Sequence, residues 1–459
     1  MKIFRDLGFF PPNQTTSKAM ETYSDELAPS SGSIIKKKSA SSISKRCSSV
    51  LDGGDSPYYL GWKEFQRNPY DPVFNPGGCI QLGLAESKLS LDLLEQWLDS
   101  HPEATRFPVD EIAVYPDYAG LASFRKVFAS FMEEVLGGGQ VAFDPDNIVM
   151  TAGATAAIDV LSFCLAQAGD VFLVPAPYYP GFTRDSRWRS DVELTPVESS
   201  SANGFNVTPA SLKAAFHQCA KLGKKVRALL VASPSNPVGN SLQADTLKQM
   251  LEFTKSEGIH LICDEVYAGS TFDDPEFVSI AKIMESGDYD RASVHMVYGI
   301  SKDLGLPGLR VGALYSWNKQ VLSTAARLGR FCSVSTQTQC FVSAFLSDKE
   351  FVRDYLRENK KRLKARRDWV VEMLRNTGTG CAKGNAGFYC WIDLSRFLKA
   401  PTEEAETELW KKVVYEVGLN LTPGSACHSP EPGWFRFCFA NQDEDTLEVA
   451  IRRLEDLRA

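Results

Sequence analysis

The sequence lacks the patterns that define metal sites, disulfide frameworks and membrane spans. Its eleven cysteines are an odd number with no Cys-x-x-Cys pair among them, and only five histidines are present. This usage argues against a zinc site and a disulfide framework, and it favours reduced cysteines in a cytoplasmic protein. No apolar run approaches the roughly 20 residues that span a bilayer, so we expect no membrane partner.

The chain also lacks an excess of positive charge. It has 50 Lys and Arg residues against 57 Asp and Glu, mixed along its length, and a formal net charge of −7. A nucleic-acid-binding protein usually carries a basic excess or patch, so we expect no nucleic-acid partner. With 459 residues, 44% hydrophobic and 23% charged, the composition is that of a globular protein with two or three compact units.

The start of the chain differs in composition from the rest. It is rich in Ser, Lys and Gly and has little apolar periodicity, so we predict a disordered N-terminal extension over residues 1–55. The first residues, "MKIFRDLGFFPPNQ", have no continuous apolar core of a signal peptide, and acidic residues argue against a transit peptide.

The middle of the chain alternates between apolar strand-like runs and helix-like segments. Examples of the strand runs are "VRALLV", "GIHLICDEVY" and "VHMVYGIS", and "LQADTLKQMLEFTKSEG" is a helical stretch between two of them. Short apolar strands separated by amphipathic helices predict an α/β fold with a mostly parallel central sheet. Ligands of such sheets bind beyond the carboxyl ends of the strands.

The C-terminal third has a different pattern. A long basic amphipathic segment, 349–376, precedes two strand-like runs, "AGFYCWIDL" and "GWFRFCFAN", and a closing helical segment. We predict a large domain over 108–344 and a smaller α+β domain made of 56–107 and 345–459.

Lys302 is the first candidate for chemistry, because it follows an apolar run and is surrounded by glycines. A lysine that forms a Schiff base must be partly desolvated or lie beside another cation, so that its neutral form is accessible. Arg310, eight residues later, supplies such a cation and also suits a phosphate group. An exposed lysine after a strand is the ordinary alternative.

Other polar residues fall at the ends of the neighbouring runs. Asp264 ends an apolar run and is followed by Tyr267, and Asn236 lies between two prolines. A buried carboxylate needs a partner, and the pyridine nitrogen of pyridoxal phosphate (PLP) is one. Gly153-Ala-Thr begins a helix, where free N–H groups bind phosphate, and Tyr179 could stack on a planar ring. Taken singly, Asp264 also fits a salt bridge, Asn236 a turn and Tyr179 packing in the core.

Taken together and in this order, these residues resemble the PLP-dependent class I and II aminotransferases, which share the aspartate-aminotransferase fold. The resemblance is closer to plant 1-aminocyclopropane-1-carboxylate (ACC) synthases. It extends from about residue 61 to the end, through "GWKEFQRNPYDPVFNPGGCIQLGLAESKLS", "PYYPGFTRDSRWR", "SPSNPVG", "DEVYAGSTF", "SKDLGLPGLRVG" and "WFRFCFAN".

The resemblance implies a role for each matching residue around the cofactor. Lys302 binds PLP and later takes the proton from the substrate's Cα, and Asp264 keeps the pyridine nitrogen protonated. Tyr267 and Asn236 bond the phenolic oxygen of the ring, and Tyr179 (less favoured, Tyr178) stacks on its face. The phosphate is implied to lie on Ala154, Thr155 and Arg310, with Ser301 as a further cofactor residue.

The resemblance also implies how the substrate is bound. Arg436 would pair with the substrate carboxylate, and Glu86 would lie near the positive sulfonium of S-adenosylmethionine. Tyr118 would reach the cofactor of a second copy, which implies a homodimer with shared active sites. The implied reaction gives ACC, the precursor of ethylene, and methylthioadenosine, with no metal.

Three departures from the family's motifs leave alternatives open. Gly299 stands where the family has a phosphate-binding serine, "GLAESK" replaces "GLAENQ", and "YPDYAG" replaces "FQDYHG". They keep open an ACC synthase-like aminotransferase or a C–S β-lyase that acts on ordinary amino acids. A non-catalytic protein that retains the fold is the alternative from another class.

Overall fold

The computed structural model describes residues 43–52 and 55–458. The chain divides into two compact units, 1–53 and 54–459. The described part of the first unit is helix α2 (Lys45–Asp52). This helix lies inside the range 1–55 predicted to be disordered, and so does Asp55, which pairs with Lys63 and Arg184. Residues 1–42 and 53–54 of that range lie outside the described residues.

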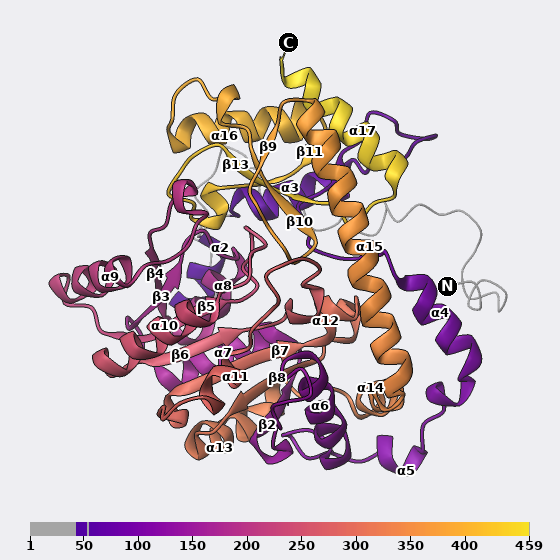
Figure 1. Cartoon of the computed structure of the whole chain (residues 1–459), viewed down its shortest axis with the longest axis vertical. Helices are drawn as coiled ribbons and strands as arrows, with labels where there is room; N and C mark the ends of the chain where they lie inside the picture. Colours follow the sequence, from indigo (N-terminus) through magenta and orange to yellow (C-terminus); the bar gives the residue numbers. More distant parts are fainter. Residues whose placement is uncertain (1–42, 53–54, 459) are drawn as a thin grey trace, which may run out of the picture. The chain divides into compact units, whose positions relative to one another are not determined.

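The second unit is organised around a seven-stranded sheet in the order β2-β8-β7-β6-β5-β3-β4. Strand β8 is antiparallel to both of its neighbours, and all the other pairs are parallel. The predicted α/β class with a mostly parallel sheet is therefore confirmed (Figure 1). The strands are β2 (Ile148–Thr151), β3 (Val171–Pro175), β4 (Glu193–Val197), β5 (Val226–Ala232), β6 (His260–Asp264), β7 (Val294–Gly299) and β8 (Gly312–Ser316).

Helices pack against this sheet, and one of them also reaches a second sheet. Helix α15, the longest, contacts α14 as well as strands of the second sheet (Figure 1). The helices are α3 (Pro57–Arg67), α4 (Leu91–Ser100), α5 (Val109–Ile112), α6 (Ala122–Val135), α7 (Ala154–Leu165), α8 (Gly181–Ser190), α9 (Pro209–Lys221), α10 (Ala244–Glu257), α11 (Ile280–Glu285), α12 (Ile300–Asp303), α13 (Lys319–Leu328), α14 (Thr336–Ser347), α15 (Lys349–Asn376), α16 (Glu403–Lys411) and α17 (Glu444–Glu455).

The second sheet is antiparallel and has four strands in the order β12-β13-β10-β9. A short parallel pair joins β1 to β11, so the segment that precedes the large sheet in sequence pairs with the C-terminal part of the chain. This pairing accords with, but does not by itself define, the predicted domain boundaries, which stay a prediction. The strands are β1 (Ile80–Gln81), β9 (Gly380–Cys381), β10 (Tyr389–Asp393), β11 (Leu419–Asn420), β12 (Thr422–Pro423) and β13 (Trp434–Cys438).

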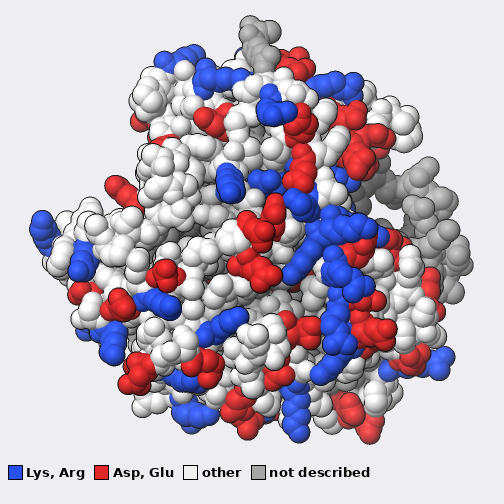
Figure 2. Space-filling model, viewed as in Figure 1, with Lys and Arg blue, Asp and Glu red and all other residues white. Residues whose placement is uncertain are grey.

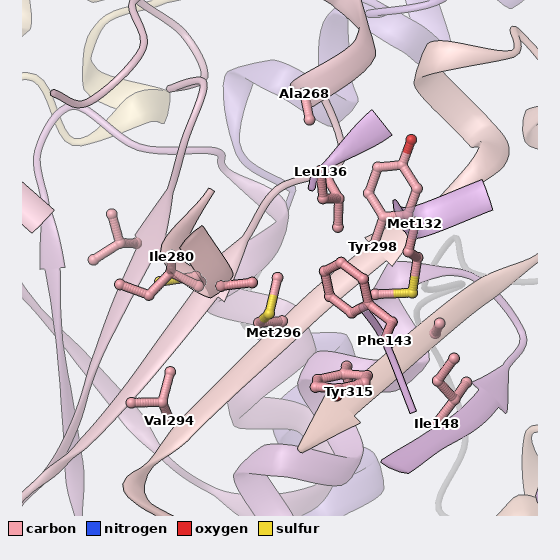
Figure 3. Close-up of a cluster of buried hydrophobic side chains, with 14 of the residues drawn as sticks. Met132, Leu136, Phe143, Ile148, Ala268, Ile280, Val294, Met296, Tyr298 and Tyr315 are labelled. Atoms are coloured by element: carbon pink, nitrogen blue, oxygen red, sulfur yellow. The ribbon is translucent and has the colours of Figure 1, made fainter. Parts of the chain in front are cut away.

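The large sheet is buried on both faces, which explains why its strands are continuously apolar. Along β7, Met296 and Tyr298 pack into one hydrophobic cluster, whereas Val297 packs into the cluster on the other face. Figure 3 shows part of the first cluster, in which residues of α6, α11 and several strands interlock. A third cluster joins the small sheet to α15, α16 and α17.

Charge is mixed over the surface that Figure 2 shows, where Lys and Arg alternate with Asp and Glu. On α15 several basic side chains pair with acids one turn away, such as Arg357 with Asp354 and Lys364 with Asp368. None of the described helices is both long and apolar enough to cross a membrane.

We expect Phe128→Ala to destabilise the protein strongly. Its ring is fully buried and packs against Phe124, Phe131 and Tyr298, so truncation leaves a cavity and costs about 3–5 kcal/mol. Phe74→Ala is the control: this ring is 90% exposed, and its loss should change the free energy of unfolding by less than about 0.5 kcal/mol. Guanidinium unfolding measures both, and equal effects would contradict the core assignment.

Candidate active site

One cavity, of about 200 Å³, brings together most of the residues that the sequence singled out. It lies at the carboxyl ends of β5, β6 and β7, where the register places Ala232 beside Asp264 and Asp264 beside Val297. Nine of the predicted site residues line it, namely Ala154, Thr155, Tyr179, Asn236, Asp264, Tyr267, Ser301, Lys302 and Arg310.

Lys302 lies on α12, which begins directly where β7 ends. Its Nζ donates a hydrogen bond of 2.7 Å to the carbonyl oxygen of Ala85. Desolvation, followed by the nearby Arg436 cation, lowers the pKa of the Lys302 amine to about 8, although Glu86 and Asp264 oppose this. A substantial fraction of the amine is therefore neutral, and able to act as a nucleophile or base, near neutral pH.

Asp264 ends β6 with a buried carboxylate. Desolvation raises its pKa to about 7, while a hydrogen bond from the Val266 N–H and the charge of Lys302 act in the opposite direction. It makes no ion pair within 43–52 and 55–458. A buried carboxylate without a cation favours a ligand that carries an N–H donor or a positive charge.

Two aromatic hydroxyl groups differ in their surroundings. Tyr267 is buried, and its Oη has no hydrogen-bond partner among the described residues. The nearby Tyr389 hydroxyl instead donates to the carbonyl of Ser235. Tyr179 lines the cavity, whereas Tyr178 stacks on His428 at 4.4 Å and does not line it. The orphaned Tyr267 hydroxyl is thus free to donate to a ligand.

Part of the cavity lining comes from the start of α7 and from Arg310. The first N–H groups of a helix have no partner within it and favour an anion. Arg310 donates to the carbonyl oxygens of Pro307 and Ala152. Gly153 has φ of +84°, and a Cβ there would lie 2.3 Å from Arg310 Nη2, so glycine is required for this close approach.

Gly299, the departure from the family's serine, also has a structural reason. A Cβ at this position would lie 2.8 Å from the carbonyl oxygen of Val311, so a larger residue would require the backbone to shift. Ser301, two residues later, lines the cavity and is the hydroxyl available on α12.

Three predicted residues do not line the cavity. Arg436, on β13, is fully buried beside it: Nη1 donates to Asn236 Oδ1 at 2.7 Å and Nη2 to Gly83 O at 2.6 Å, and Nε has no partner among the described residues. Glu86 is half-buried and close enough to affect the Lys302 pKa. Tyr118 lies instead beside Arg330, so one copy of the chain does not bring it to the cavity.

Several lining residues were missed by the sequence reasoning. Tyr58 comes from α3, which packs against β11 and β12, and Phe182 and Asp185 come from α8. Desolvation, then Asp264 and Asp159, raises the pKa of Asp185 to about 8. The adjacent tyrosines of "SPYYLGW" were a possible signal for Tyr58, because "PYYPGF" has the same pair. The letters around Asp185 are those of an ordinary helix.

Several solved structures that share this architecture are aminotransferases. Aspartate aminotransferase from Thermus thermophilus superposes with a TM-score of 0.73 at 20% identity, covering 91% of this chain and 99% of that one. At this identity the likeness concerns the fold alone, which is the predicted aspartate-aminotransferase-like fold.

The sequence comparisons are more specific. The model of aminotransferase class I and II matches residues 80–454. 1-Aminocyclopropane-1-carboxylate synthase 3 of Solanum lycopersicum is 47% identical over 424 residues, and synthase 9 of Arabidopsis thaliana is 48% identical over 424, each covering 90% of both chains. The chain belongs to the class I and II aminotransferase family and, within it, to the ACC synthases, as the resemblance predicted.

We expect Lys302 to react with small aldehydes faster than surface lysines do. At pH 7 a group with a pKa of 8 is about 10% neutral, against about 0.04% for an ordinary lysine. Reductive methylation of the cofactor-free chain with formaldehyde, followed by peptide mass spectrometry, measures this, with the exposed Lys213 as the reference. Slower labelling of Lys302 at every pH would contradict the lowered pKa.

Proposed function

We propose that this chain is a PLP-dependent carbon–sulfur lyase that converts S-adenosylmethionine to ACC and methylthioadenosine. The observation that carries the proposal is the cavity that joins Lys302, with its lowered pKa, to the uncompensated Asp264. The identity of 47–48% to ACC synthases over 90% of the chain supports this activity. It disfavours the aminotransferase and β-lyase alternatives.

The residues present fit PLP. Asp264 would hold the pyridine nitrogen, because it is a buried carboxylate that lacks a cation. Tyr267, whose hydroxyl has no partner among the described residues, and Asn236 would hold the phenolic oxygen, and Tyr179 would stack on the ring. Lys302 would bind the aldehyde carbon. The phosphate would lie on Ala154, Thr155, Ser301 and Arg310.

PLP, when bound, supplies an electron sink for the negative charge that develops at the substrate's Cα. The chain's own residues then decide which proton moves and where. An amine with a pKa near 8 is well matched to take the Cα proton near neutral pH, because efficient general bases titrate near the working pH. Among the nine predicted residues that line the cavity, Lys302 alone carries an amine.

The substrate is held by groups at the side of the cavity nearest the small sheet. Arg436 would bind the substrate carboxylate, since its buried guanidinium has an Nε without a partner among the described residues. Glu86 would face the sulfonium, whose positive charge it stabilises. Within the substrate, a Cα–Cγ bond forms while the Cγ–S bond breaks, and the electron pair leaves with sulfur as a neutral thioether.

We also propose a cytoplasmic homodimer with shared active sites. Tyr118 does not reach the cavity of its own chain, and the neighbouring Val114 and Tyr115 are 62% and 91% exposed. Apolar side chains exposed next to one another are suited to contact with a second copy. Sedimentation of the purified chain tests the dimer.

We expect the purified protein to show the absorption band of bound cofactor and to turn over S-adenosylmethionine. Addition of this substrate should shift the band and release ACC and methylthioadenosine in equal amounts, as measured by chromatography of the same sample. In Lys302→Ala the turnover should fall by more than about 10⁴-fold with an unchanged far-ultraviolet circular dichroism spectrum. A band that responds only to ordinary amino acids would replace the lyase by an aminotransferase.

We expect Arg436→Lys to raise KM for S-adenosylmethionine by about tenfold or more, because an ammonium group cannot replace the planar guanidinium fork. Arg453→Lys is the matched control, since this arginine donates to the carbonyl oxygens of Pro76 and Gly78 away from the cavity. Steady-state kinetics measure both variants. An unchanged KM in Arg436→Lys would remove Arg436 from the substrate role.

A further inference from the structure

Asp303, the residue directly after Lys302, is a fully buried carboxylate to which no role has been assigned above. Its Oδ2 accepts hydrogen bonds from the Gly269 N–H at 2.7 Å and from Tyr298 Oη at 2.8 Å. Its Oδ1 accepts one from Ser270 Oγ at 2.6 Å. Three donors thus converge on one side chain, which satisfies the buried charge.

The three donors come from two different elements. Tyr298 lies on β7, the strand that leads into Lys302. Gly269 and Ser270 belong to the single helical turn, Ala268–Ser270, that directly follows Tyr267. The carboxylate therefore ties the segment that carries Lys302 to the segment that carries Tyr267.

Asp303 packs directly against Gly269, where there is no room for a side chain. A Cβ on Gly269 would lie 2.8 Å from Asp303 Cγ, so a side chain there would push the two segments apart. Figure 3 shows the Tyr298 ring within the hydrophobic cluster, with its hydroxyl pointing out of the cluster. Tyr298 is fully buried, so the direction of this hydroxyl is fixed by the core.

Helix α12, which carries Lys302, has only four residues. A helix of this length is not stable by itself, so its position depends on tertiary contacts. Besides the Asp303 carboxylate, two bonds from α15 hold it: Tyr355 Oη donates to Leu304 O at 2.9 Å, and Asn359 Nδ2 donates to Asp303 O at 3.4 Å. Helix α15 also contacts the turn after Tyr267, but of these three groups only the carboxylate is hydrogen-bonded to that turn.

We propose that Asp303 is a positioning residue, which fixes the Lys302 amine and the Tyr267 hydroxyl relative to each other. This inference rests on the proposed function, because it concerns how two cofactor residues act together. Another buried acid nearby, Glu265, has a different task, since it accepts bonds from Ser279 and the Ile280 N–H at the start of α11.

Near neutral pH the Asp303 carboxyl is mostly ionised, which suits a group that accepts three hydrogen bonds. Burial raises the pKa of its carboxyl to about 6, although the hydrogen bonds from Ser270, Tyr298 and Gly269 lower it. Above that pH the group is an acceptor only, which matches three donors. In Asp303→Asn the amide oxygen can still accept two of the bonds, and the amide can donate to the Ser270 hydroxyl, so this variant is the milder one.

The test compares Asp303→Ala, Asp303→Asn and Tyr298→Phe in the cofactor-loaded protein. Asp348→Ala is the control, because Asp348 likewise accepts bonds from a side chain and a backbone N–H, Trp97 Nε1 and Phe351 N, but does not line the cavity. For each variant we would measure the pH midpoint of the absorption of bound cofactor, the thermal unfolding temperature, kcat and KM.

We expect Asp303→Ala to raise the pH midpoint by about one unit, because a displaced Tyr267 no longer stabilises the ionised phenolic oxygen. Its kcat should fall by about tenfold or more, with KM changed by less than about threefold. Tyr298→Phe and Asp303→Asn should show smaller shifts in the same direction. Asp348→Ala should lower the unfolding temperature without moving the midpoint.

The opposite result would overturn the inference. If Asp303→Ala lowers the unfolding temperature like the control but keeps the midpoint and kcat of the unmutated protein, Asp303 is structural only. If Asp303→Ala does not fold, unchanged midpoints in both Tyr298→Phe and Asp303→Asn overturn it equally. Absence of a cofactor band in the unmutated protein would instead remove the proposed function, and this inference with it.

Discussion

The active site depends on desolvation, which acts in opposite directions on two groups in one cavity. It lowers the pKa of the Lys302 amine to about 8 and raises that of the Asp264 carboxyl to about 7. Each group alone would be costly to bury in its charged form. Together they create a cavity in which an amine is partly neutral and a carboxylate lacks a cation. A ring with an aldehyde and a basic nitrogen satisfies both, and the chain provides this arrangement before any ligand arrives.

The parallel sheet brings these groups together. Strands β5, β6 and β7 run in the same direction, and their register aligns Ala232, Asp264 and Val297. The residues at and after the end of each strand therefore lie at one edge of the sheet. Asn236, Asp264 and Lys302 meet there, although the first and the last are 66 positions apart in the sequence. Because both faces of this sheet are covered by hydrophobic clusters, the edge is held on a rigid support.

The sequence predicted those parts of the site that follow from short stretches of consecutive residues. Strand ends are visible as apolar runs that stop at Pro, Gly or a charged residue, so the α/β fold and most of the nine predicted lining residues could be found, whereas Ser301 came from the family resemblance. Tyr58 was missed, because the tyrosine pair of "SPYYLGW" does not by itself show that α3 packs against β11 and β12 and so brings Tyr58 to the cavity. The bond from Arg436 to Asn236 joins β13 to the loop after β5 and has no local signal in the sequence. Asp303 was missed for the same reason: in the sequence it reads as an exposed acid next to a lysine, and only the packing of Tyr298 and Gly269 shows its burial.

In the proposed function, the residues that would hold the cofactor and those that would hold the substrate come from different parts of the fold. The cofactor groups lie on or near the large sheet, whereas Arg436 lies on β13 of the small sheet and Glu86 follows β1. The two sets meet where Arg436 donates to Asn236 and where Arg436 and Glu86 act on the pKa of Lys302. Solved aminotransferases that are about 20% identical share the fold with this chain, whereas the two ACC synthases named above are 47% and 48% identical to it over 424 aligned residues. The departures at Ser87, Lys88, Pro116 and Ala119 fall outside the residues that line the cavity, whereas Gly299 is one of them. The first four departures therefore leave the lining of the cavity intact.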